Sequence, residues 1–288
     1  MLITIAGMIG GGKSSLTKLI TEEFGGKGYF EDANSPILQK FYTASPEELE
    51  AKRYPFLLQL EFLNSRFSMI KKCLIEGDNP KVNTLDRSIY EDQYFMEVNH
   101  QLGRISDDEA VIYTNLLNNM LEELEELPKK APDLLIYLKG SFETFKSRIE
   151  NRGRSFEALD EETEAYFYKL WQGYDAWVEE CYKASPVLII DIDKFDYVND
   201  KVDKAIVLAL VKTKLIELGL LETKAQEGTA IIRGVYEFTA SLSPMENAEL
   251  LPEEEIKENL EEVFAEAFDE SSVAGYDAKI TKFKLDIN

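Results

Sequence analysis

Short apolar runs alternate along this chain with longer stretches in which apolar residues recur every three or four positions. The short runs, which are typical of buried strands, span residues 2–6, 28–31, 82–86, 133–138 and 187–192. The helical periodicity occupies residues 14–24, 46–75, 89–102, 107–127, 141–151, 161–184 and 199–217. Because strands that alternate with helices form parallel sheets covered on both faces, the pattern predicts an α/β fold, a five-stranded parallel sheet flanked by helices.

The pattern changes after residue 217. A polar stretch is followed by an alternating apolar run at 229–238, an amphipathic acidic helix at 252–269 and a second alternating run at 278–285. Two strands and a helix predict a small folded α+β module rather than a disordered tail. We therefore expect a large domain over residues 1–217 and an acidic C-terminal module of unknown role over residues 218–288.

Charge narrows the classes of partner. The chain carries 54 acidic and 32 basic residues, a net charge of −22, which argues against nucleic acid because phosphate backbones need basic surface. No apolar run approaches the ~20 residues of a membrane span, and no basic leader precedes the first strand. We therefore expect a cytoplasmic protein without a membrane partner.

A glycine-rich motif follows the first apolar run directly. It reads Gly7-Met8-Ile9-Gly10-Gly11-Gly12-Lys13-Ser14 and fits the phosphate-loop pattern G-x-x-x-x-G-K-[ST]. Glycines let successive backbone N–H groups face phosphate oxygens, Lys13 reaches the β- and γ-phosphates, and Ser14 is placed to ligate Mg²⁺. Ser15 continues into a helix, whose N-terminus attracts anions. The motif predicts a site for a nucleoside triphosphate such as ATP.

Two further groups of polar residues end the second and third apolar runs. Glu31 follows the second run and is a candidate general base for an acceptor hydroxyl, although residues here also suit helix capping. Asp86 and Arg87 follow the third run, where an acid can help to hold Mg²⁺ and an arginine can reach phosphate. A salt-bridged loop is the alternative reading of this pair. Carboxyl ends of parallel strands share one edge of a sheet, so both groups are expected near the phosphate loop.

Three arginines lie close together at the end of a predicted helix. Arg148 and Arg152 are one turn apart, and Gly153 ends the helix just before Arg154. A mobile segment with three guanidiniums could close over phosphoryl groups and neutralise their charge. A solvated basic helix end is the alternative.

Together these motifs resemble the deoxyribonucleoside kinase family, most closely its bacterial deoxyadenosine and deoxyguanosine kinases, over residues 1–217. The resemblance implies a phosphate-loop kinase that transfers the γ-phosphate of ATP to the 5′-hydroxyl of a deoxynucleoside with Mg²⁺. It implies that Glu31 is the general base that deprotonates the 5′-hydroxyl and that Tyr42 and Glu157 bind the sugar 3′-hydroxyl. It also implies a homodimer. By the same resemblance the base-reading residues are Gln59, Arg66 and Asp92, and the lid residues are Arg148, Arg152 and Arg154. Residues from 218 onward have no counterpart in the family pattern.

Physical reasoning supports a neutral acceptor. A nucleoside needs hydrogen-bonding and stacking groups rather than a second phosphate clamp, and the Gln59 amide offers a donor and an acceptor in one plane. Phe56, Phe62, Tyr90 and Phe95 could stack on the ring, although each is also an ordinary core residue. The helices at 46–75 and 107–127 are long enough to supply a dimer face.

Three alternatives stay open. A nucleoside monophosphate kinase shares the loop and an arginine-bearing lid but needs extra cations for the acceptor phosphate. A nucleotide-gated regulatory protein would use ATP as a switch and the C-terminal module as its effector. An active kinase whose C-terminal module contacts a partner combines the two. The sequence leaves deoxyadenosine, deoxyguanosine and deoxycytidine as candidate substrates.

Overall fold

The computed structural model describes residues 1–31, 35–75, 82–126, 132–153 and 160–221. Residues Met1–Leu221 form one compact unit. The strands and the acidic helix expected between residues 229 and 285 lie outside the described residues, so the proposed C-terminal module stays a prediction. Within the described part of the chain, no helix is both long enough and apolar enough to cross a membrane.

The five-stranded parallel sheet is confirmed. Its strands are β1 (Leu2–Gly7), β2 (Lys27–Tyr29), β3 (Asn83–Asp86), β4 (Leu134–Lys139) and β5 (Val187–Asp191), in the spatial order β2-β3-β1-β4-β5. Every paired strand runs parallel to its neighbour. The register places Ile5 opposite Asp86 and Gly7 opposite Leu138. The end of β3 therefore lies beside the start of the phosphate loop.

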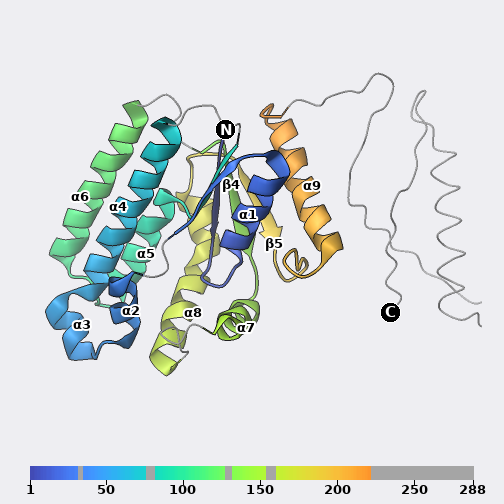
Figure 1. Cartoon of the computed structure of the whole chain (residues 1–288). Coiled ribbons are helices and arrows are strands. Elements are labelled where there is room, and N and C mark those ends of the chain that lie inside the picture. The colour runs from blue at the N-terminus through green and yellow to red at the C-terminus, as the bar shows by residue number, and fades with distance from the viewer. Residues whose placement is uncertain (32–34, 76–81, 127–131, 154–159, 222–288) are drawn as a thin grey trace, which may run out of the picture. The chain divides into compact units, whose positions relative to one another are not determined.

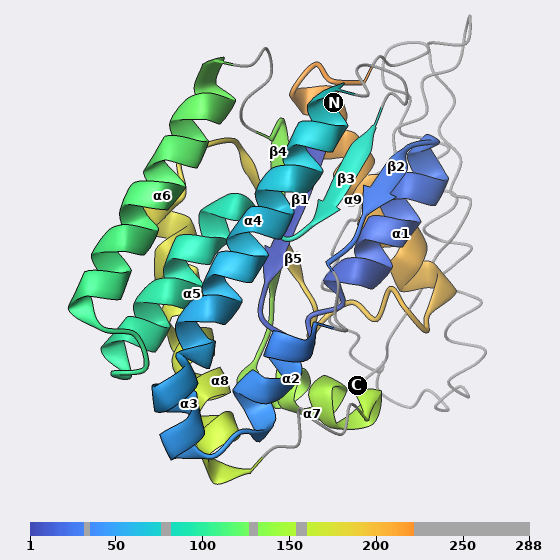
Figure 2. The ribbon, with the colours of Figure 1, turned by 60° about the vertical axis from the view of Figure 1, so that its left-hand side comes forward.

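Helices cover both faces of the sheet (Figures 1 and 2). α1 (Lys13–Phe24) and α9 (Lys201–Glu217) lie on one face, and α4 (Tyr54–Ile75), α5 (Ile89–Gln101) and α8 (Glu161–Ala176) lie on the other. α6 (Asp107–Glu126) packs on the outside of α4 and α5, and α7 (Phe142–Arg152) follows β4. The main core cluster contains Ile3, Ile5 and Ala6 of β1 and the apolar side chains of β4, all of them buried.

Three helical regions differ from the sequence prediction. The predicted helix at 46–75 is two helices, α3 (Pro46–Lys52) and α4, because Arg53 takes a left-handed conformation with φ 53°. The Arg53 side chain then pairs with Glu109 of α6, with Nε 2.7 Å from Oε1. The stretch at 161–184 ends as an α-helix at Ala176 and continues as a π-helical turn, Trp177–Cys181.

The third difference is a helix that hydrophobic periodicity did not predict, α2 (Pro36–Thr43). Its signals are local: Ser35 caps the helix by accepting hydrogen bonds from the N–H groups of Ile37 and Leu38, and Pro36 occupies the first helical turn. The serine-proline pair is a sequence signal for the start of a helix. This helix matters because it carries Tyr42 to the wall of a cavity that lies beside the phosphate loop.

Candidate active site

The phosphate loop connects β1 to α1, and close packing explains its glycines. Gly10 and Gly12 have φ angles of 82° and 87°, which side-chain-bearing residues rarely adopt. A Cβ at Gly10 would lie 2.8 Å from Cγ1 of Ile149, and one at Gly12 would lie 2.6 Å from the Tyr197 hydroxyl oxygen. No side chain caps the N-terminus of α1, so its first N–H groups are available to an anion.

Lys13 is buried beneath this loop. Its Nζ donates to the carbonyl oxygens of Gly7 and Met8 at 2.8 Å and 2.7 Å. Burial lowers the pKa of Lys13 to about 7, and the neighbouring Arg87 guanidinium acts in the same direction against the attraction of Asp86. An incoming triphosphate would restore the charge of Lys13 at a point fixed by two carbonyl groups.

Ser14 and Asp86 come together beside the loop. Ser14 Oγ donates a hydrogen bond to Asp86 Oδ2, which joins the first turn of α1 to the end of β3. Burial raises the pKa of Asp86, Lys13 opposes this shift and Glu31 adds to it. A hydroxyl and a carboxylate side by side are oxygen ligands of the kind that Mg²⁺ takes together with phosphates and water. In the described ranges, no group of three or more His, Cys, Asp or Glu side chains could hold a metal alone.

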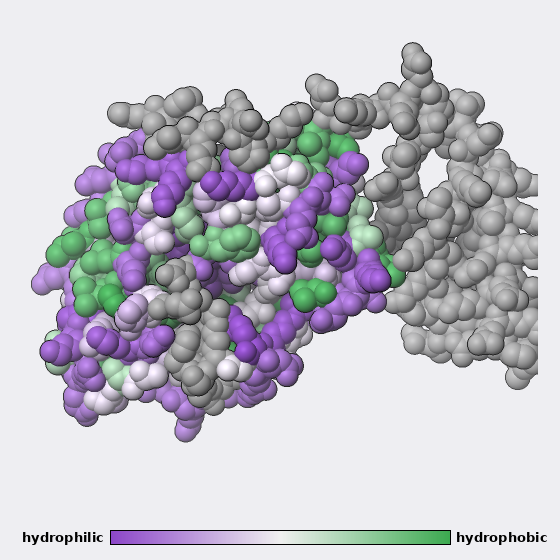
Figure 3. Space-filling model, viewed as in Figure 1, coloured by the Kyte–Doolittle hydropathy of each residue, from purple (hydrophilic) through white to green (hydrophobic). Residues whose placement is uncertain are grey.

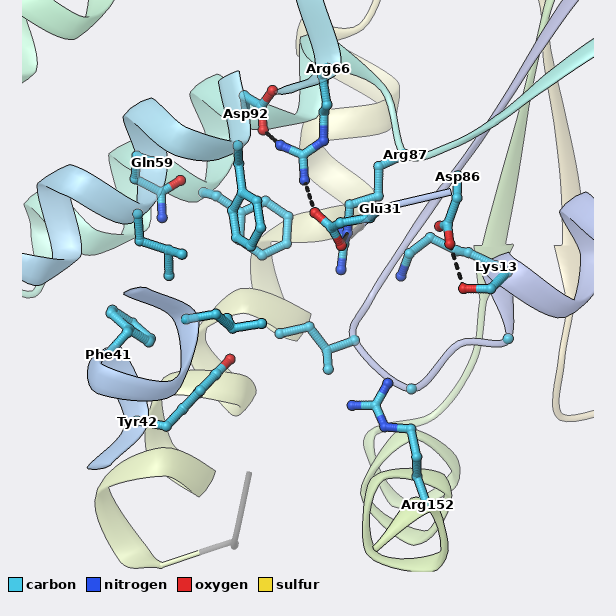
Figure 4. Close-up of a pocket in the computed structure, with 18 of the residues that line it drawn as sticks. Lys13, Glu31, Phe41, Tyr42, Gln59, Arg66, Asp86, Arg87, Asp92 and Arg152 are labelled. Carbon is cyan, nitrogen blue, oxygen red and sulfur yellow. Dashed lines mark hydrogen bonds and ion pairs between the residues drawn. The ribbon is translucent and has the colours of Figure 1, made fainter. Parts of the chain in front are cut away.

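A series of ion pairs crosses the site from α5 to the phosphate loop (Figure 4). Arg66 of α4 pairs with Asp92 of α5 and with Glu31, which follows β2. Arg87 Nε donates to the other Glu31 oxygen at 3.1 Å. The Arg66, Arg87 and Asp92 side chains are 4%, 7% and 1% exposed, against 23% for Glu31. Among these four side chains, Glu31 is thus the most accessible to a ligand.

Glu31 lies in the middle of this series of ion pairs. Burial alone raises the pKa of its carboxyl, but Arg66, Arg87 and Lys13 reverse this, and the net pKa lies below its ordinary value. Glu31 is therefore an anion at neutral pH, ready to accept a hydrogen bond from a hydroxyl group. The ion pairs with Arg66 and Arg87 also fix the orientation of this carboxylate.

A cavity of about 360 Å³ lies between the phosphate loop and α2, α4 and α5. Gln59 is buried in its wall, and its Oε1 accepts no hydrogen bond from any described residue. Phe62 and Phe95 line the cavity, whereas Phe56 packs in a separate core cluster. Figure 4 shows Gln59, Phe41 and Tyr42 together on the side of the cavity away from Lys13. The cavity thus has a phosphate end and an aromatic, hydrogen-bonding end.

The arginines of α7 approach from the opposite wall. Arg148 donates to the carbonyl oxygens of Gly11 and Ile192 at 3.4 Å and 3.2 Å. Arg152 lines the cavity, and Gly153 ends α7 with φ 65°. Arg154 and Glu157 lie outside the described residues. The predicted site residues that do line the cavity are Gly10, Gly12, Lys13, Ser14, Ser15, Glu31, Tyr42, Gln59, Arg66, Asp86, Arg87, Asp92, Arg148 and Arg152.

Two buried residues that the sequence analysis missed, Glu91 and Tyr174, support the first residue of the phosphate loop through hydrogen bonds. Glu91 is 0% exposed and accepts a hydrogen bond from the Gly7 N–H, and the Tyr174 hydroxyl donates to Glu91. The signal for Glu91 was its position three residues after Ser88, the spacing of a capping box, which the structure contains. Tyr174 had no comparable signal, because only the packing of α8 brings it to the loop.

A phosphate loop that opens into a nucleoside-sized cavity, with an anionic side chain at the boundary, defines a phosphotransferase with a small acceptor. A model of the deoxynucleoside kinase family matches residues 3–217. The chain therefore belongs to the deoxynucleoside kinase family, which confirms the resemblance seen in its motifs.

Individual relatives agree with this assignment. The chain is 41% identical to a deoxyguanosine kinase of Lactobacillus acidophilus, with 80% of this chain and 97% of the relative covered. It is 39% identical to a deoxyadenosine kinase of the same organism, covering 76% of this chain and 99% of the relative. A solved structure of deoxyadenosine kinase from M. mycoides with bound dCTP superposes with a TM-score of 0.59 at 27% identity, covering 75% of this chain and 100% of the other.

The buried Lys13 gives a testable pH dependence. Its folded pKa of about 7 lies below the value of a solvated lysine, so the unfolded chain binds more protons between these two pH values. The cost of burying Lys13 is therefore present below pH about 7 and disappears as pH rises toward 10. We expect Lys13→Met to raise the melting temperature of the nucleotide-free protein at pH 6.5 and to lose that advantage at pH 9.5.

Differential scanning fluorimetry at both pH values measures this effect. Lys18→Met is the matched control, because Lys18 lies on the same helix with its side chain 71% exposed. A Lys13→Met variant that melts at or below the wild-type temperature at pH 6.5 would contradict the prediction.

Proposed function

We propose that this chain transfers the γ-phosphate of ATP to the 5′-hydroxyl of a purine deoxynucleoside, deoxyadenosine or deoxyguanosine, in nucleotide salvage. The observation that carries the proposal is the position of Glu31, an anion held by two guanidiniums between the phosphate loop and the cavity that Gln59 lines. The names of the relatives support a purine substrate.

The donor half would hold ATP through the loop N–H groups and Lys13. Ser14 and Asp86, whose oxygen atoms lie side by side, would hold Mg²⁺, with phosphate and water oxygens completing its shell. The bound ion would neutralise charge on the transferring group. Arg148 and Arg152 reach the same region from α7, and the family resemblance adds Arg154 from outside the described residues.

The acceptor half would hold the deoxynucleoside. Its base would lie against Gln59, Arg66 and Asp92, and the sugar 3′-hydroxyl against Tyr42 and, by the family resemblance, Glu157. Glu31 would orient the 5′-hydroxyl and take its proton as the phosphoryl group transfers in line. A low pKa suits this role, because phosphoryl transfer passes through a loose transition state and needs positioning more than a strong base.

The charges of the acceptor half argue against a nucleoside monophosphate. Arg66 is paired with Asp92 and Glu31, and Arg87 with Glu31 and Glu91. These two cations are balanced before any ligand arrives, so a second phosphate would meet carboxylates rather than an uncompensated positive site. A neutral sugar and base fit this surface better.

Removal of the proposed base should affect turnover selectively. We expect Glu31→Gln to lower kcat by roughly 10²- to 10⁴-fold with little change in KM for the deoxynucleoside, because the amide keeps the shape but cannot take the proton. Steady-state kinetics with ATP and Mg²⁺ measure both constants. Glu22→Gln, on the exposed face of α1, is the control, and unchanged turnover in Glu31→Gln would remove Glu31 as the base.

A substrate panel tests the proposal as a whole. With ATP and Mg²⁺, we expect deoxyadenosine or deoxyguanosine to be phosphorylated with the highest kcat/KM, deoxycytidine less well, and thymidine and dTMP least. A chain that stops after Leu221 should keep its turnover within about twofold, because the family match ends at residue 217 and Leu218, Leu220 and Leu221 pack against the core. A strong preference for a monophosphate, or ATP binding without transfer, would favour the alternatives.

We also propose a homodimer through the outer face of α6. Val111, Ile112 and Leu116 of this helix are 59%, 58% and 37% exposed, and Leu57 of α4 is 39% exposed. Hydrophobic residues gather over this side of the molecule in Figure 3. Large exposed apolar side chains on one face are typical of an interaction surface.

Substitution of this face tests the dimer. We expect the full chain to elute with the mass of a dimer in size-exclusion chromatography with light scattering, and Ile112→Glu to shift it to the monomer because a charge would be buried in the interface. Val198→Glu, at an exposed apolar residue between β5 and α9, should leave the mass unchanged. A monomeric wild-type chain would exclude this surface as a dimer interface.

A further inference from the structure

The carboxylate of Glu91 is buried completely, and the ion-pair and capping arrangements around it use both of its oxygens. Oε1 lies 3.1 Å from the backbone nitrogen of Gly7, 2.5 Å from the Tyr174 hydroxyl and 3.4 Å from Nη1 of Arg87. Oε2 accepts from the Ser88 N–H at 3.1 Å. A helix cap alone would need only the second oxygen, so the first is committed to the phosphate loop.

The partners of Glu91 also hold the other polar group of Gly7. The Gly7 carbonyl oxygen lies 3.1 Å from the Tyr174 hydroxyl, 3.4 Å from Arg87 Nη1 and 2.8 Å from Lys13 Nζ. Gly7 itself has φ 143°, and a Cβ there would lie 2.8 Å from the Leu138 carbonyl oxygen. Both backbone groups of the first loop residue are therefore fixed by the same small set of side chains.

Arg87 depends on this arrangement as well. Its backbone takes a left-handed conformation with φ 80°, which is uncommon for a residue with a side chain and persists only where the surroundings enforce it. The Arg87 N–H donates to the Ile5 carbonyl at 2.9 Å, and the side chain lies between Glu91 and Glu31. Glu91 thus contacts the donor loop directly and the proposed base through Arg87.

The next residue of α5 acts on the other half of the site. Asp92 pairs with Arg66, which pairs with Glu31. Two consecutive carboxylates at the start of one helix are therefore connected to Glu31 by two separate routes, and one of them is also bonded to the phosphate loop. The first turn of α5 is the element that fixes donor and acceptor relative to each other.

We propose that Glu91 is a positioning residue for phosphoryl transfer: it fixes Gly7 and Arg87 relative to each other so that the donor phosphates and the Glu31-bound hydroxyl meet in line. This inference rests on the proposed function of the same site. Glu91 acts through Gly7, Arg87 and Tyr174. Its loss should therefore affect the transfer step more than the binding of either substrate.

The matched controls lie elsewhere in the chain. Glu109 caps α6 by accepting from the Ser106 N–H and pairs with Arg53, which repeats the chemistry of Glu91 on an element that does not line the cavity. Tyr113 is a fully buried tyrosine whose hydroxyl has no hydrogen-bond partner in the described part of the chain. Glu109→Gln and Tyr113→Phe therefore measure the general effects of these substitutions on folding.

The experiment compares steady-state kinetics and melting temperatures of the full-length variants. We expect Glu91→Gln to lower kcat about 30-fold or more at saturating ATP and deoxynucleoside, with both KM values within about threefold of wild type. Tyr174→Phe should lower kcat about threefold to tenfold. Glu109→Gln and Tyr113→Phe should keep kcat within twofold, even where they lower the melting temperature as much.

A double-mutant cycle separates positioning from a merely structural role. Because Glu91 acts in part through Arg87, Glu91→Gln should lower kcat by a smaller factor in an Arg87→Gln background than in the wild-type background, whereas independent effects would multiply. If the effects of the two substitutions on kcat multiply fully, the inference is overturned. A Glu91→Gln variant with kcat within twofold of wild type overturns it as well. If Glu91→Gln does not fold, Tyr174→Phe with the kcat of Tyr113→Phe overturns it instead.

The outcomes also distinguish this inference from the proposed function. Activity that is lost in Glu31→Gln and kept in Glu91→Gln rejects the positioning role alone. A wild-type chain that phosphorylates no deoxynucleoside rejects both.

Discussion

The constraint on which the site depends is that charges buried together must be paired. Asp92, Arg66, Glu31, Arg87 and Glu91 follow one another with alternating sign, and four of them are almost fully enclosed. Removal of one member of a buried pair leaves an uncompensated charge, which is far more costly than the pair itself. Each member therefore fixes its neighbours, and the series as a whole gives the cavity one geometry. Lys13 lies beside this series, and burial lowers its pKa to about 7, so a bound phosphate would favour its charged form.

The sheet supplies the frame for these pairs. In the order β2-β3-β1-β4-β5, the carboxyl ends of β1, β3 and β2 are adjacent, and they deliver the phosphate loop, Asp86 with Arg87, and Glu31. The second layer, α4 and α5, returns Arg66 and Asp92 to the same point. Residues separated by 35 and 56 positions thus form hydrogen bonds to a single carboxylate. The chemistry is spread along the chain because parallel strands need a crossover between each pair.

Local signals accounted for much of this arrangement and long-range contacts for the rest. Apolar runs predicted all five strands, and the glycine-lysine-serine motif predicted the loop, because both depend on neighbours in sequence. The break at Arg53 had a local signal outside the hydrophobic periodicity, because Pro55 cannot donate an N–H inside a continuous helix but suits the first turn of α4. The pairing of Arg53 with Glu109 of α6 is a long-range contact that no local pattern reveals. The resemblance to the family assigned Arg66 to recognition of the substrate's nucleobase, whereas its ion pairs with Asp92 and Glu31 also hold the carboxylate that we propose as the general base. Tyr174 was invisible to sequence reasoning because the packing of α8 alone brings it to Gly7.

Two buried oxygen atoms lie in the part of the cavity that we propose holds the nucleobase. Gln59 Oε1 and Asp92 Oδ2 have no donor among the described residues, and an unsatisfied buried acceptor is costly. An amide can turn to present its nitrogen, so Gln59 adapts to a donor or an acceptor on the ligand. A carboxylate that pairs with Arg66 has no such alternative, and only a donor could satisfy its free oxygen. The exocyclic amino groups of adenine, guanine and cytosine are donors of this kind, whereas thymine offers only its ring N3–H. In the proposed binding mode, in which the base lies against Gln59, Arg66 and Asp92, the pairing that orders the protein part of the site also favours substrates with an exocyclic amino group.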